Sequence, residues 1–182
     1  MKHPSNRAFF DYWDSKRGDA AAPDRSEFDP DAVRELLGDI FVLAFDLTDG
    51  FPFRVAGTRV CALLGGDAKG RSFPELFTAG SRAEITDILT IVGEETQPAI
   101  AGVTARAADG TPAPLELLLL PFSARSHAPL SLTGLLAPFN GPIGPMTDFT
   151  LTSWRYLAAR PKPRAVRRWS AVRGFMVYEG LR

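Results

Sequence analysis

Cysteine and histidine are scarce in this chain of 182 residues, whose two histidines are His3 and His127. Because Cys61 is the single cysteine, the chain cannot form an internal disulfide. Structural zinc sites take four ligands, most of them cysteine or histidine, and the chain has too few of both. We therefore predict no metal site.

Long apolar runs and nucleotide-binding glycine motifs are missing as well. No run reaches the roughly 18 apolar residues of a membrane-spanning helix, and residues 1–6 lack the apolar stretch of a signal peptide. The patterns Gly-x-Gly-x-x-Gly and Gly-x-x-x-x-Gly-Lys do not occur. No nucleophile with a base, and no pair of acids, stands out. We predict a cytoplasmic protein that is not an enzyme.

Net charge is zero, but the two signs are separated along the chain. Residues 1–153 carry 13 Lys and Arg against 20 Asp and Glu, whereas residues 154–182 carry 8 against 1. The division falls just after the segment 138–145, which is rich in proline and glycine. We predict an acidic folded domain followed by a basic tail. The candidate binding cations of this tail are Arg160, Lys162, Arg164, Arg167 and Arg168.

The amino-terminal residues 1–38 predict a helical cap. Ser5 can begin a first helix, and Phe9, Phe10 and Trp13 then form an aromatic stripe on it. A second short helix begins at residues 29–30 and ends at Gly38.

Residues 39–140 predict one α+β domain, and residues 141–182 a linker with the basic tail. Two short strands, 40–46 and 53–56, form a hairpin. A capping box of Ser81 and Glu84 starts the longest helix, which shows apolar residues at i, i+3, i+4 and i+7. Three further strands follow at 99–107, 115–122 and 132–139. This order predicts a five-stranded antiparallel sheet with helices packed on one face.

Several motifs of this region resemble those of a known family. The runs 60–65, 69–77 and 81–84 resemble the central helices of PAS domains. The motifs 10–13, 29–30, 53–58 and 70–71 resemble a compact bacterial family of single-domain PAS-like proteins, formerly of unknown function. The resemblance covers about residues 9–139. It implies a five-stranded PAS sheet, a pocket between the sheet and its helices, dimerisation, and a role in bacterial signal transduction.

Strand alternation predicts which side chains line such a pocket, since successive side chains point to opposite faces. The charged Arg54, Arg106 and Glu116 should point away from the helices. The inner face would then be apolar, and the small Ala101 and Ala105 would leave room for an apolar ligand. The alternative is that neighbouring Phe and Leu side chains fill this volume. The candidate pocket residues are Phe53, Val55, Leu64, Phe73, Leu76, Ile88, Ala101, Val103, Leu117 and Leu119.

The outer face of the predicted sheet is apolar too, so something must cover it. The aromatic stripe of the first helix can do so, from the same chain or from a partner. We predict a homodimer, with apolar surface left over as its interface. The candidate interface residues are Phe9, Phe10, Trp13, Leu118, Leu120 and Phe122.

The cofactors found in some PAS domains are disfavoured here. A flavin photoreceptor of this class needs a cysteine in an Asn-Cys-Arg-like motif, whereas Cys61 lies in the run 59–63 ahead of a glycine pair. Haem ligation by histidine needs a histidine in or near the long helix, and residues 81–96 contain none. His127 fits a solvated loop. We predict no cofactor.

We interpret the chain as a PAS-type sensory or regulatory module that binds a small apolar ligand, protein partners, or both. A ligand-free dimeric adaptor is the main alternative, and a small cone-fold isomerase or hydrolase is a weaker one. The basic tail fits four partners: the acidic surface of its own domain, a signalling protein, nucleic acid, or an anionic membrane.

Overall fold

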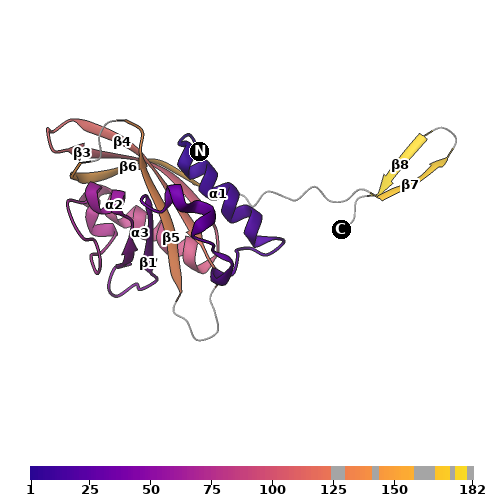
Figure 1. Ribbon diagram of the computed structural model, residues 1–182, viewed down its shortest axis with the longest axis horizontal. Helices are drawn as coiled ribbons and strands as arrows, with labels where there is room; N and C mark the ends of the chain where they lie inside the picture. Colours follow the sequence, from indigo (N-terminus) through magenta and orange to yellow (C-terminus); the bar gives the residue numbers. More distant parts are fainter. Residues whose placement is uncertain (124–129, 141–143, 158–166, 173–174, 180–182) are drawn as a thin grey trace.

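A single antiparallel sheet forms the centre of the fold, and helices cover both of its faces (Figure 1). The computed structural model describes residues 1–123, 130–140, 144–157, 167–172 and 175–179. The α+β class predicted from the sequence is confirmed.

The sheet has six strands in the order β2-β1-β5-β4-β3-β6, and each neighbouring pair is antiparallel. The strands are β1 (Ile40–Ala44), β2 (Phe53–Ala56), β3 (Ala99–Ala107), β4 (Pro112–Pro121), β5 (Ser131–Pro138) and β6 (Met146–Tyr156).

The predicted count of five strands was wrong, because β6 adds a sixth strand along the edge of β3. The segment 138–145, rich in proline and glycine, was interpreted as the end of the domain. It instead connects β5 to β6. Part of the range predicted as linker and tail therefore belongs to the sheet.

Beyond β6, the strands β7 (Arg167–Val172) and β8 (Phe175–Glu179) pair with each other in a two-stranded sheet. The range 141–182, predicted as linker and tail, thus contains these two strands as well as β6. Arg160, Lys162, Arg164 and His127 lie outside the described residues.

Helix α1 (Pro4–Arg17) lies on one face of the sheet, and α2 (Thr58–Leu63) and α3 (Ala79–Glu94) lie on the other. Three short 3-10 helices join them, η1 (Arg25–Glu27), η2 (Asp31–Leu36) and η3 (Pro74–Leu76). In the ranges that the structure describes, no helix combines the length and the apolar character needed to cross a membrane.

Two predicted helix starts were wrong in detail. The cap of α1 is His3, whose Nδ1 accepts a hydrogen bond of 3.2 Å from the Ser5 backbone N–H. Helix α3 begins two residues before Ser81, whose hydroxyl accepts a hydrogen bond from the Leu151 N–H at 3.1 Å. Its predicted capping partner, Glu84, instead accepts one from the Trp154 indole on β6. Tertiary partners on β6 replace the local cap.

Candidate functional site

The interior between the sheet and helices α2 and α3 is where the sequence placed a ligand pocket. Apart from Val55, every predicted pocket residue belongs to the apolar core on this side or packs against it. Phe53, Ile88 and Leu117 are almost completely buried. The alternation of the strands therefore identified this inner core correctly on β3 and β4.

Val55 was assigned wrongly, because it is 59% exposed. On β2, Val55 pairs with Val42 while Phe53 pairs with Leu43, so Arg54 is an extra residue in the ladder. Such a β-bulge shifts the alternation of side chains by one position. Phe53 accordingly points into the inner core, and both Arg54 and Val55 point out of it.

Phenylalanine rings fill the inner core beside the predicted pocket. Phe73 lies 5.1 Å from Phe41 and 5.5 Å from Phe53, measured between ring centroids. Phe77 continues the row, 5.5 Å from Phe73 and 5.9 Å from Phe149. These spacings are those of directly packed aromatic pairs.

Three of these rings, Phe41, Phe77 and Phe149, were absent from the predicted site. Phe149 belongs to β6, the strand that the sequence did not reveal. Phe41 sits in an apolar run without alternation, so its face could not be assigned. Its ring lies against Gly134 of β5, where a Cβ atom would collide with it.

The opposite face of the sheet carries a second core, closed by α1. Phe9, Phe10 and Trp13 pack against Ile100, Leu118, Leu120 and Phe122. The Trp13 indole N–H also donates to the Pro121 carbonyl at 2.7 Å. The aromatic stripe thus covers the outer face of its own chain, and all six candidate interface residues are buried within one molecule.

Glu116 is a buried acid on this outer face, 6% exposed. Its carboxylate accepts hydrogen bonds from the backbone N–H groups of Lys2 at 2.6 Å and His3 at 2.9 Å, and from the Asn6 amide at 3.1 Å. Burial pushes the pKa of Glu116 upward, but these donors outweigh burial and hold the pKa below its ordinary value. Glu116 points away from α2 and α3, as predicted, and fixes the start of α1.

An ion pair joins helix α2 to the start of β1. The Arg59 guanidinium donates to both carboxylate oxygens of Asp39, at 2.7 and 2.8 Å, and to the Glu35 carbonyl at 2.7 Å. The hydrogen bond with Asp39 raises the pKa of Arg59 above its ordinary value, against the opposing effect of burial. This bidentate contact fixes helix α2 against the start of β1.

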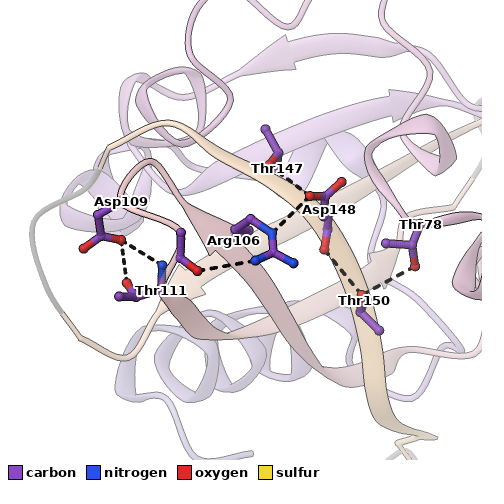
Figure 2. A network of polar contacts seen from close by, with 8 residues as sticks. Thr78, Arg106, Asp109, Thr111, Thr147, Asp148 and Thr150 are labelled. Carbon is purple, nitrogen blue, oxygen red and sulfur yellow. Dashed lines mark hydrogen bonds and ion pairs between the residues drawn. The ribbon is translucent and has the colours of Figure 1, made fainter.

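Polar residues join the β3–β4 hairpin to β6 at the edge of the sheet (Figure 2). Arg106, which points outward as predicted, lies 3.4 Å from Asp148 and donates to the Gly110 carbonyl at 3.4 Å. Asp148 has a positive φ of 53°. Both charged side chains are well exposed, so their pairing contributes little energy.

A groove of about 500 Å³ lies beside this network, between Thr78, Thr104, Pro112 and Thr150. It is lined by an exposed ion pair, hydroxyl groups and a proline, without a buried polar group among the lining residues.

The described ranges hold no group of three or more His, Cys, Asp and Glu residues placed to bind a metal. Cys61 is half-buried on α2, and its Sγ lies 3.7 Å from the Ala56 carbonyl oxygen.

Comparison with known proteins finds a match to one family model. The sequence matches a family model described as PAS domain over residues 1–137. Among curated proteins, no relative matches the sequence.

Similar solved structures include a LOV protein, a LOV domain and a PAS domain. The LOV protein of Rhodobacter sphaeroides is 19% identical, with a TM-score of 0.43 over 59% of this chain and 65% of that chain. The LOV domain of a blue-light activated histidine kinase from Erythrobacter litoralis is 13% identical, with a TM-score of 0.43 over 56% of this chain and 95% of that one. The PAS domain of an HTR-like protein from Haloarcula marismortui is 19% identical, with a TM-score of 0.43 over 60% and 91%. This chain therefore spans just under two thirds of the Rhodobacter sphaeroides protein.

Proposed function

The chain belongs to the PAS domain family, and we propose that it is a signalling module that relays its signal through protein contacts, without a cofactor or ligand in its inner core. Family membership supports the signalling role. The proposal favours the ligand-free adaptor over the ligand-binding sensor, the two main alternatives that the sequence left open. It assigns no catalytic step to the chain.

One observation carries this proposal: the contacting row of Phe41, Phe53, Phe73, Phe77 and Phe149. A ligand between sheet and helices would have to displace at least one of these rings. Burial of a phenylalanine side chain contributes about 1.5–3 kcal/mol. A weakly bound apolar molecule does not recover that cost, since native interiors are already packed densely.

The packing of these phenylalanine rings also disfavours the binding of a cofactor in the inner core. A flavin or haem is larger than any single side chain, so its entry would require several rings to move. The half-buried Cys61 lies on α2 and contacts a backbone carbonyl. We propose that neither flavin nor haem binds.

We also propose that the chain forms a homodimer, through surfaces other than the six residues first considered. Those residues are buried between α1 and the sheet of their own chain. The large apolar side chains exposed in the described ranges are Leu37, Leu47, Val55, Phe139 and Trp154. Contact between two copies would remove some of this surface from water.

Native mass spectrometry of the freshly purified chain, with its visible absorption spectrum, tests the proposal. We expect masses of the polypeptide and of its dimer without bound small molecules, and a spectrum without flavin or haem bands. A small molecule present at one copy per chain would overturn the ligand-free assignment. A monomer at all concentrations would overturn only the dimer.

The variant Phe73→Ala serves as the matched control, because it opens a cavity in the row of rings. An apolar cavity about as large as an aromatic side chain can bind benzene-like molecules. We expect indole to bind Phe73→Ala and not the unmodified chain. Binding of indole to the unmodified chain would contradict a filled core. If Phe73→Ala does not fold, Phe77→Ala opens a cavity at the neighbouring ring of the same row for the same comparison.

A further inference from the structure

Helix α3 and strand β6 form a surface that combines negative charge with exposed aromatic rings. Glu84 and Asp87 lie three residues apart on one side of α3, and Glu95 caps the carboxyl end of this helix. All three side chains are exposed. Trp154 and Tyr156 lie on β6 beside them. We call these five residues the α3–β6 surface.

One hydrogen bond and one pair of packed rings link the aromatic side chains to this acidic side of α3. The Trp154 indole N–H donates to the Glu84 carboxylate, and the ring is 39% exposed. The Tyr156 ring packs edge-on against it, with 5.1 Å between centroids. Burial, and then the charges of Glu95 and Asp87, raise the pKa of Tyr156, so these two carboxylates act on its hydroxyl.

This surface has no cation of its own within the part of the chain that the structure describes. The ion pairs found there join Arg17 to Asp14, Arg34 to Asp31, Arg59 to Asp39 and Arg106 to Asp148. None involves Glu84, Asp87 or Glu95. Carboxylates gathered on one face of a helix repel one another, and an exposed indole favours a cation over its ring. The surface therefore fits a cationic segment that carries Arg or Lys.

Such a segment follows directly in the sequence. The Leu157 N–H donates to the Pro98 carbonyl at 2.7 Å, so the chain leaves β6 beside the segment that connects α3 to β3. Arg160, Lys162 and Arg164 come three to seven residues later. Because an extended chain covers about 3.3 Å per residue, these side chains can reach the carboxylates.

We propose that the segment 160–164 binds the α3–β6 surface of its own chain. Exposed ion pairs are individually weak and are screened by salt. A short tether, however, holds the cations at an effective concentration of about a millimolar or more, which favours the same chain over any free partner. This contact is independent of whether the inner core takes a ligand.

Zero-length cross-linking of the full chain tests the contact. A carbodiimide activates a carboxylate, the Lys162 amine attacks it, and an amide forms as the activating group leaves as a urea. At low salt we expect Lys162 linked to Glu84, Asp87 or Glu95 in species of monomer mass. Links only in species of dimer mass would replace the same-chain contact by one between copies. Absence of any link between Lys162 and α3 would overturn the proposal.

Trypsin cleavage after Arg164 gives a second readout, since the bonds after Arg160 and Lys162 precede proline and resist the enzyme. We expect the double variant Asp87→Asn, Glu95→Gln to be cut several-fold faster than the unmodified chain at low salt, and equally fast at high salt. The double variant Glu27→Gln, Asp49→Asn removes the same charge from η1 and from the β1–β2 turn, and should not change the rate. Equal rates for all three chains at low salt would contradict the contact. Tighter binding of the first variant to anionic vesicles or to nucleic acid would show what the released segment binds.

Discussion

Individual buried polar residues of this chain hold separate elements together. Glu116 ties the start of α1 to β4 through three N–H donors, and Asp39 ties the start of β1 to α2 through Arg59. A buried carboxylate is stabilising only where such donors replace its lost water. Removing the acid therefore costs more than the loss of one hydrogen bond.

We expect Glu116→Gln to lower the free energy of unfolding by about 1–3 kcal/mol at neutral pH, since the ionised acid is the better acceptor. The pKa of Glu116 is lower in the folded state than in the unfolded state. Its contribution is therefore complete above the unfolded pKa of about 4.3 and is lost as the pH falls through the folded value.

Urea unfolding of both chains across this acidic range tests the expectation. The difference between them should shrink as the pH falls below about 4. The exposed Glu27→Gln is the control and should change stability little at either pH. A constant difference between Glu116→Gln and the unmodified chain would contradict a lowered pKa.

Gly57 lies so close to neighbouring backbone that no residue with a Cβ atom fits at this position. A Cβ atom there would collide with the backbone carbonyl groups of Leu37 and Gly38, next to the Arg59–Asp39 ion pair. We expect Gly57→Ala to destabilise the fold by about 1–3 kcal/mol through overpacking. Gly80 is the matched control, because an added Cβ meets nothing within 4 Å on α3. Gly80→Ala should be neutral or stabilising by up to about 1 kcal/mol in the same denaturant titration. Equal effects of the two substitutions would refute the close approach.

At the scale of helices and strands, helical periodicity predicted α1 and α3, and apolar runs between turn residues predicted the strands β1 to β5. These elements carry strong patterns, such as the helical spacing of Ile85, Ile88, Leu89 and Val92. Alternation also identified most of the inner core, because β3 and β4 run without a bulge between them.

What the sequence could not reveal depends on contacts between distant residues. The bulge at Arg54 turned Val55 outward, and bulges leave little trace in a short strand. Strand β6 followed a segment rich in proline and glycine, and it pairs with β3, from which it is separated along the chain by β4 and β5. Ser81 and Glu84 formed no capping box because Leu151 and Trp154 of β6 compete for them. Missing β6 thus also hid Phe149 and the α3–β6 surface.

At the scale of the whole molecule, one sheet separates two apolar cores. Strand β4 supplies Leu117 and Leu119 to the inner core and Leu118 and Leu120 to the outer one. Because both cores share the backbone of β4, a rearrangement of one core would also displace side chains of the other. The helices on opposite faces are therefore coupled through β3, β4 and β5, although α1 and α3 lie on different sides of the sheet.

This coupling predicts a single cooperative unfolding transition. We expect Phe9→Leu in the outer core and Phe73→Leu in the inner core each to lower the midpoint of the same transition, rather than to split it. Far-ultraviolet circular dichroism and calorimetry should give coincident curves, with equal calorimetric and van't Hoff enthalpies, as in two-state domains. Since the two sites share no contact, their effects on the free energy of unfolding should add to within about 0.5 kcal/mol in the double variant. A separate early transition in Phe9→Leu would mean that α1 melts on its own, and the outer core would then be a detachable cover rather than part of one folding unit.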